Sequence, residues 1–308
     1  ELAEAYGVPI HIHLGETARE VEEHRAEYGM PVVPWVKKQG LFRARVTAMH
    51  AVHLDAGELQ TLLHHGATIV HNPTSNLKLA SGIAPVARML ELGIPVGIGT
   101  DGAASNNDLD MIEELRLAAL LPKVQTGDPT AAPAPAVLRM ATIDGARAIH
   151  MDHLIGSIEP GKRADVIVVE LGGPHGTPQY TFGAGPYAMI AYAAKSTDVR
   201  HSVINGRLVM RDRRLLTLDV DAVLDEARHV AGEISAFVVQ RERSLLDKLV
   251  ALGEIEQEDI FEVQIKARVA DPEALERTLR GDPSFQVLRH SLRQQYDTYL
   301  LFENGDQG

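Results

Sequence analysis

The chain has 308 residues, of which 45% are apolar and 23% are charged, and its formal net charge is −12 at pH 7. This length accommodates one large domain or two medium ones, and the negative charge disfavours nucleic acid or an anionic membrane as the main partner. The chain has no cysteine and 14 histidines, which excludes disulfides and thiolate nucleophiles and leaves His, Asp and Glu as possible metal ligands.

The first residues, ELAEAYG, have the pattern of a last helical turn that ends at Gly7. They lack the basic and apolar regions of a signal peptide, and no apolar run approaches the about 18 residues of a membrane-spanning helix. We therefore expect a cytoplasmic protein. Because the sequence begins with Glu and ends at a turn after a strand pattern, we also expect it to be part of a longer chain.

Residues 8–101 repeat a unit of short apolar strand, polar loop and amphipathic helix. Strands are predicted at 8–14, 45–51, 67–72 and 95–101, and helices at 16–29, 31–40, 55–66 and 83–93. This alternation predicts a parallel sheet that is covered on both faces. In such sheets chemistry collects at the carboxyl ends of the strands, where the sequence has His13, His50, His71 and Asp101.

The sequence pattern of the remaining residues changes twice. Residues 108–150 have helical patterns, whereas 156–220 consist of short strands and Gly/Pro turns, which predicts a small β unit. A charged helix is predicted at about 220–250, and residues 261–302 then show a strand, a helix and two more strands. We place a domain boundary near 250–258.

His13 ends the first predicted strand, and Glu16 follows three residues later in the loop. A neutral imidazole there can bind a metal and a nearby carboxylate can carry a proton, but the pair alone fits better with local hydrogen bonding and a helix start. His50 and Asp101, at the ends of two other strands, change this interpretation. The four side chains would form a partial site for a hard metal with a proton shuttle.

Catalytic zinc sites normally have three protein ligands and a water. Two good ligands are present here, His13 and Asp101. At least one ligand is therefore missing, which agrees with a longer chain.

The runs HIHLGET, HAVHLD, HNPTSNLKLASGIAPV and GIGTDGAASNNDLDM resemble the amidohydrolase superfamily. They are similar in particular to the 5′-methylthioadenosine/S-adenosylhomocysteine deaminases and their triazine-hydrolase relatives, over about residues 1–230. The resemblance implies an α/β fold, namely the C-terminal half of a metal-dependent (β/α)8 barrel with part of a small β-sandwich. The family's first-strand His-x-His pair is not found in this sequence.

The same resemblance implies roles for five residues. His13 and Asp101 would bind Zn²⁺ or another divalent metal such as Fe²⁺, and Asp101 would accept the proton of the attacking water. Glu16 would contact the substrate and protonate its ring nitrogen, His50 would polarise the water or the intermediate, and Ser105 would line the substrate pocket. The implied reaction is hydrolytic deamination of a small adenine-type nucleoside, with release of ammonia. The oligomeric state stays open.

Residues 258–308 resemble the opening of a CYTH domain, the triphosphate-tunnel fold. Glu262, Gln264 and Lys266 alternate along one strand, and Gln264 replaces a carboxylate of that pattern. An exposed amphipathic strand is the alternative. The resemblances together imply four segments: the second half of the barrel at 1–155, a β-sandwich portion at 156–220, a helical connection at 221–257 and a partial CYTH-like module at 258–308.

Two other functions stay open. One is a triazine, guanine or cytosine aminohydrolase on the same barrel. The other is a non-catalytic remnant that binds polyphosphate or a partner through residues 258–308. We expect the chain by itself to be inactive, because part of the metal site is missing.

Overall fold

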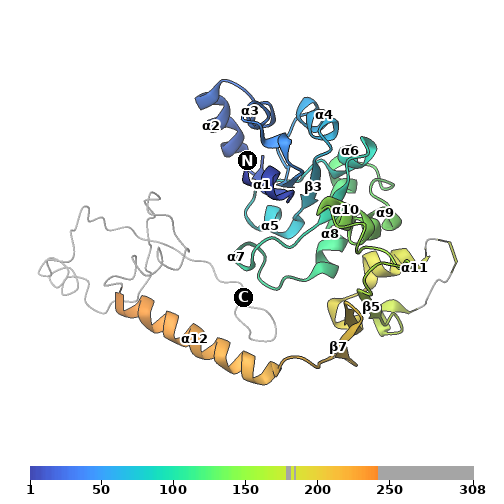
Figure 1. Ribbon diagram of the computed structural model, residues 1–308. Helices are drawn as coiled ribbons and strands as arrows, with labels where there is room; N and C mark the ends of the chain where they lie inside the picture. The colour runs from blue at the N-terminus through green and yellow to red at the C-terminus, as the bar shows by residue number, and fades with distance from the viewer. Residues whose placement is uncertain (178–181, 184, 242–308) are drawn as a thin grey trace, which may run out of the picture. The chain divides into compact units, whose positions relative to one another are not determined.

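The computed structural model describes residues 1–177, 182–183 and 185–241. The chain divides into two compact units, residues 1–228 and residues 229–308. The first unit contains two four-stranded sheets and most of the helices (Figure 1). It begins with α1 (Leu2–Tyr6), which ends at Gly7 in the left-handed conformation, as the sequence predicts.

The first sheet consists of four parallel strands in chain order. They are β1 (Ile10–Leu14), β2 (Val46–His50), β3 (Thr68–His71) and β4 (Val96–Ile98). The four predicted strands are therefore confirmed, each somewhat shorter than its apolar run. In register, His13 lies opposite Met49 and Leu14 lies opposite His50, so neighbouring strands end at the same edge.

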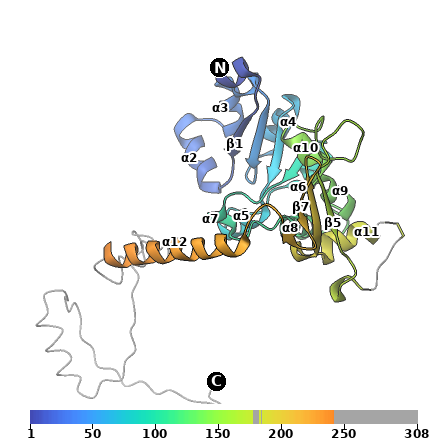
Figure 2. The same ribbon diagram turned by 60° about the horizontal axis from the view of Figure 1, so that its bottom comes forward.

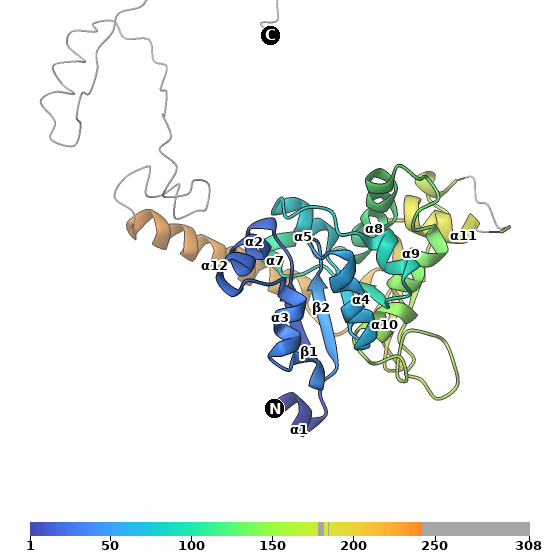
Figure 3. The ribbon, with the colours of Figure 1, turned by 90° about the horizontal axis from the view of Figure 1, so that it is seen from above.

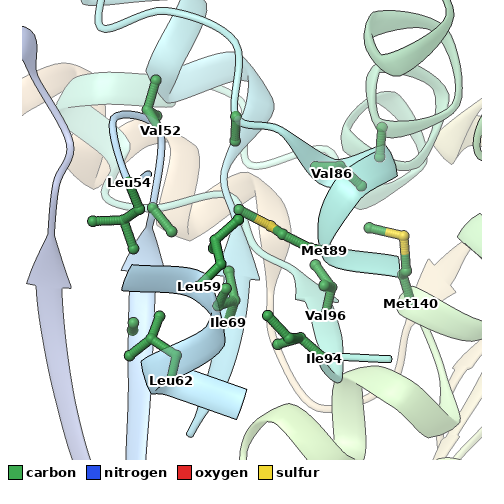
Figure 4. Close-up of a cluster of buried hydrophobic side chains, with 14 of the residues drawn as sticks. Val52, Leu54, Leu59, Leu62, Ile69, Val86, Met89, Ile94, Val96 and Met140 are labelled. Atoms are coloured by element: carbon green, nitrogen blue, oxygen red, sulfur yellow. The ribbon is translucent and has the colours of Figure 1, made fainter. Parts of the chain in front are cut away.

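Helices cover one face of this sheet and form the hydrophobic core with it. The core draws on α3 (Val32–Lys38), α4 (Ala56–His64), α6 (Val86–Glu91), α8 (Met111–Thr126) and α9 (Ala134–Met140). Figure 3 shows α3 and α4 beside β1 and β2. In Figure 4, Leu59 and Leu62 of α4 lie against Ile69 of β3, and each of these side chains is at most 2% exposed. Full burial of one such side chain stabilises the fold by about 1.5–3 kcal/mol.

Two short helices follow the strand ends and were not predicted from the sequence. They are α5 (Pro73–Lys78), directly after β3, and α7 (Ala103–Asn106), shortly after β4. The predicted helix at 16–29 is present as α2 (Ala18–Tyr28). The short segments 41–43, 174–176, 189–193 and 196–198 form single turns of 3₁₀ or π type.

The opposite face of the sheet is covered at one end by α10 (Ile143–Ala148). The hydroxyls of Thr47 and Thr68 donate to the carbonyl oxygen of Ala148 at 2.8 and 2.6 Å. Gly97 allows this close packing, because a Cβ at this position would lie 3.1 Å from the Ala148 Cβ and 3.2 Å from the Gly145 Cα. The rest of this face lines a groove of about 790 Å³ together with residues of the second sheet.

The second sheet is antiparallel and confirms the predicted small β unit (Figure 2). Its strands are β5 (Val166–Val169), β6 (Val199–Ile204), β7 (Arg207–Arg211) and β8 (Arg214–Leu215), and α11 (Gly185–Ala188) lies between β5 and β6 in the sequence. Asn205 and Gly206, both with positive φ, form the two-residue turn between β6 and β7. Asn-Gly is the preferred sequence for such a hairpin turn.

The last described element is α12 (Val220–Arg241), in the region where a charged helix is predicted. The CYTH-like segment at 258–308, with Glu262, Gln264 and Lys266, lies outside the described residues, as does the domain boundary near 250–258. Of the helices that the structure describes, none combines the length and apolarity that crossing a membrane would need.

Candidate metal and catalytic site

His13 and Glu16 lie at the carboxyl end of β1. The His13 side chain is 60% exposed and that of Glu16 is 21% exposed, and their Nδ1 and Oε2 atoms are 3.8 Å apart. Between them, Gly15 has a φ of +61°, and a Cβ there would lie only 2.6 Å from the Leu54 Cδ2. Both the positive φ and the close approach of Leu54 favour glycine in the turn that places Glu16 beside His13.

A capping box at the start of α2 fixes the same loop. The Thr17 side chain accepts a hydrogen bond from the Glu20 amide, and the Glu20 carboxylate accepts from the amides of Gly15 at 3.0 Å and Glu16 at 2.8 Å. Thr followed three residues later by Glu is a recognised sequence signal for a helix start. The position of the Glu16 backbone is thus determined by the beginning of α2.

His50 ends β2 in a strained turn and is fully buried. The φ of His50 is +68°. The backbone amide of Ala51, the next residue, donates a hydrogen bond to the carbonyl oxygen of Met49, the preceding residue, at 2.9 Å. Positive φ at a non-glycine residue is uncommon, and such strain is concentrated at functional sites. The turn directs His50 towards the strand edge that also carries His13.

Three contacts orient the His50 ring. Nδ1 lies 2.8 Å from the Asn76 Oδ1, and Nε2 lies 3.2 Å from the His13 Nδ1 and 3.6 Å from the Glu16 Oε2. An amide oxygen only accepts hydrogen bonds, so Nδ1 donates to Asn76, and Nε2 is the ring nitrogen that faces His13 and Glu16. The space between the two histidines therefore suits a proton or a cation.

Asp101 follows β4 and also has a positive φ, +61°. The hydroxyls of Ser75 and Ser105 both donate to its Oδ2, each at 2.7 Å. Burial acts to raise the pKa of Asp101, but the hydrogen bonds from Ser105 and Ser75 outweigh it and hold the pKa below the usual value. Asp101 is therefore a carboxylate at neutral pH.

The ligand atoms that His13, His50 and Asp101 offer all lie within 4.8 Å of one another. Two imidazoles and a carboxylate are a donor set that fits zinc and related divalent metals. The five side chains singled out in the sequence thus come together: these three, Glu16 beside the histidines and Ser105 on Asp101.

Sequence reasoning missed the residues that hold this group from one side. Ser75 and Asn76 on α5 bind Asp101 and His50, and the Ser81 hydroxyl reaches the Glu16 Oε1 at 3.4 Å. His53, at 2.6 Å, donates from Nε2 to the Ser81 carbonyl oxygen. The available signal was the run NPTSNLKLAS, which directly follows a strand and therefore begins at the same edge of the sheet.

His71 also ends a strand, but it does not join the group. It is 1% exposed, and in the described part of the chain neither ring nitrogen has a hydrogen-bond partner. Burial, and secondly the nearby His50, lowers the pKa of His71 to about 3. This histidine is therefore a neutral, buried side chain.

The amidohydrolase family matches residues 1–209 of the chain. A 5-methylthioadenosine/S-adenosylhomocysteine deaminase of Desulforudis audaxviator is 48% identical over 232 residues, which are 75% of this chain and 53% of the relative. The chain thus spans about half the length of the curated relatives it matches.

Solved structures give a similar result. An adenosine deaminase from Xanthomonas campestris with bound zinc is 38% identical with a TM-score of 0.72, covering 76% of this chain and 53% of that protein. An atrazine chlorohydrolase from Arthrobacter aurescens, complexed with zinc, is 28% identical with a TM-score of 0.67, covering 74% and 49%.

Proposed function

The chain belongs to the amidohydrolase family, and we propose that the protein carrying it deaminates adenine-type nucleosides by hydrolysis, with release of ammonia. The convergence of His13, His50 and Asp101 within 4.8 Å, with Glu16 beside them, is the observation that carries the proposal. The deaminases among the similar proteins support this substrate class. Methylthioadenosine, S-adenosylhomocysteine and adenosine are the candidate substrates.

The four parallel strands fit the C-terminal half of a (β/α)8 barrel. Their chain-order arrangement and the match to about half of the relatives' length support this. In this arrangement residues 1–155 belong to the barrel and residues 156–220 to a β-sandwich. The candidate site then lies where such barrels carry their chemistry, at the carboxyl ends of the strands.

His13 and Asp101 are the residues that would hold a divalent metal, either Zn²⁺ or Fe²⁺. When bound, the metal would supply Lewis acidity and lower the pKa of a water from about 15.7 towards 7. The zinc in two similar structures supports zinc as the ion.

The protein's own side chains would move the protons. Asp101, kept ionised by Ser75 and Ser105, accepts the proton of the attacking water. Glu16 delivers a proton to the ring nitrogen next to the attacked carbon. When the addition product collapses, the proton held by Asp101 passes to the amino group, which leaves as ammonia, and the hydroxyl proton returns to Glu16. His50, with Nδ1 held by Asn76, would accept a hydrogen bond at Nε2 from the attacking water and so polarise it. Ser105 also lines the nucleoside pocket.

The test is an ammonia-release assay on the complete, zinc-loaded protein. Adenosine, methylthioadenosine, S-adenosylhomocysteine, guanine and a triazine are offered side by side. Glu16→Gln should lower the rate by about 10²–10⁴-fold, as expected for loss of a general acid, while the zinc content stays the same. Glu22→Gln, which changes an exposed carboxylate on α2, is the matched control and should leave the rate unchanged.

Two results would contradict the proposal in different ways. Turnover of guanine or the triazine alone would overturn the nucleoside assignment but leave the metal site in place. An unchanged rate for Glu16→Gln on every substrate would remove the proton-shuttle role.

A further inference from the structure

Glu114 is a buried carboxylate that the reaction above does not use. It lies in the first turn of α8 and is 1% exposed. Its Oε1 accepts from the Asn106 side-chain amide at 2.5 Å, and its Oε2 accepts from the Thr74 backbone amide at 3.0 Å. Thr74 belongs to α5 and Asn106 ends α7, so one carboxylate connects both short helices to α8.

Burying this acid is costly. Burial raises the pKa of Glu114, and the hydrogen bonds from Thr74 and Asn106 oppose that rise only in part. A buried ionisable group is weak evidence for stability, because apolar residues of similar volume often replace such groups without loss. The side-chain oxygen of Asn106 is also hydrogen-bonded, because Oδ1 accepts from the Leu109 backbone amide at 2.7 Å.

The two connected helices carry the partners of the candidate catalytic groups. From α5, Ser75 donates to Asp101 and Asn76 accepts from His50, and from α7, Ser105 donates to Asp101. A second link, on the exposed side, runs from the Lys78 Nζ to the Ala104 carbonyl oxygen at 2.7 Å and to the Asn107 Oδ1 at 2.5 Å. The relative position of α5 and α7 therefore sets how Asp101 and His50 are held.

We propose that Glu114 is a positioning residue for the deamination proposed above, on which this inference rests. It holds α5 and α7 in the arrangement that lets Ser75, Ser105 and Asn76 fix the Asp101 carboxylate and the His50 ring. It acts through these residues and not by contact with the substrate.

The first test is Glu114→Ala in the complete, zinc-loaded protein. We expect kcat to fall by about 10–100-fold, the usual effect of removing a group that orients metal ligands. KM should change by less than about threefold, because the defect concerns groups that act in the transition state. Glu113→Ala is the matched control, since Glu113 is the exposed neighbour on the same helix turn.

The second test is a reciprocal exchange that separates positioning from simple destabilisation. In Glu114→Gln, the new amide group must face either Thr74 or Asn106, both of which donate, so one hydrogen bond is lost. Adding Asn106→Asp supplies a carboxylate that accepts from that amide and still accepts from the Leu109 amide. We expect kcat to be reduced in each single variant and to return to within about threefold of wild type in the double variant.

The third readout does not depend on activity. With Co²⁺ in place of zinc, the visible absorption bands report the ligand geometry at the metal. We expect Glu114→Ala to shift or weaken these bands, and the double exchange to restore them. Glu113→Ala should leave them as in wild type.

Unchanged kcat and cobalt bands in Glu114→Ala would overturn the proposal. So would a loss of kcat that matches the loss of folded, metal-loaded protein, or a folded double variant that is not restored. If the wild-type protein releases no ammonia from any purine nucleoside, the proposed function fails, and the cobalt spectra still decide the positioning role.

Discussion

The two sheets of the first unit use similar apolar strands in different ways. All four residues of β3, with the sequence TIVH, are buried, whereas in β5, with the sequence VIVV, Ile167 is 54% and Val168 is 47% exposed. Helices cover one face of the parallel sheet and α10 covers part of the other. Burial therefore follows from the covering layers and not from the strand sequence. At the ends of the parallel strands, residues of α5 and α7 form hydrogen bonds with the polar groups.

Two aspartates extend the comparison to electrostatics. Burial acts to raise the pKa of both Asp101 and Asp198, and in both, hydrogen bonds bring the pKa below its usual value. Asp198 accepts from the His175 Nε2 at 2.7 Å and from the Lys195 amide at 2.8 Å. Of these two aspartates, only Asp101 lies with two histidines in a cluster that could hold a metal ion, in the part of the chain that the structure describes. A lowered pKa thus does not identify the site, and the convergence of ligands does.

The largest expected difference lies between these two aspartates. Asp101→Asn should lower the rate of the proposed deamination by at least about 10²–10⁴-fold and weaken zinc binding, because it removes the proposed metal ligand and proton acceptor together. Asp198→Asn should leave kcat unchanged and lower the free energy of unfolding by about 1–3 kcal/mol, through weaker hydrogen bonds to a charged group. Steady-state rates, zinc content and urea denaturation measure both. Equal rate losses in the two variants would contradict the comparison.

A matched pair of isoleucines tests the role of the covering layers. Ile69 of β3 is fully buried, whereas Ile167 of β5 is half exposed. Ile69→Ala should lower the free energy of unfolding by about 2–5 kcal/mol, the usual range for a buried Ile→Ala change. Ile167→Ala should cost about 1 kcal/mol or less, because less apolar area is lost. A larger loss for Ile167→Ala would show that this strand face is covered in the folded protein.

The smallest expected effect is on acid stability. Because the folded-state pKa of Asp198 lies below the unfolded value of about 3.9, its hydrogen bonds stabilise the fold fully above that pH. This contribution is lost as the pH falls through the lower, folded-state pKa. The urea midpoint of Asp198→Asn should therefore fall less steeply than that of wild type below about pH 4. Asp225→Asn, on an exposed part of α12, serves as the control.

Much of this arrangement could be predicted from the sequence, and the omissions share one cause. The strands β1 to β4 were recognisable because each is an apolar run between polar loops, and His13, His50 and Asp101 follow from the strand ends. The helices α5 and α7 have six and four residues, too few for a hydrophobic period of 3.6 residues to be seen. The contacts that Ser75 and Asn76 make from α5 were missed for the same reason.

The sequence by itself determined which residues lie at one edge of the parallel sheet, since the alternation of strands and helices fixes the direction of every strand. It also limited the possible ligand types, because without cysteine only imidazoles and carboxylates remain for a metal such as zinc. Only the tertiary structure decided how these groups are oriented. The contacts from Ser75 to Asp101, from Asn76 to His50 and from Glu114 to Thr74 join residues 26 to 40 positions apart. No local pattern encodes such contacts, because they exist only once the helices have packed beside the strand ends.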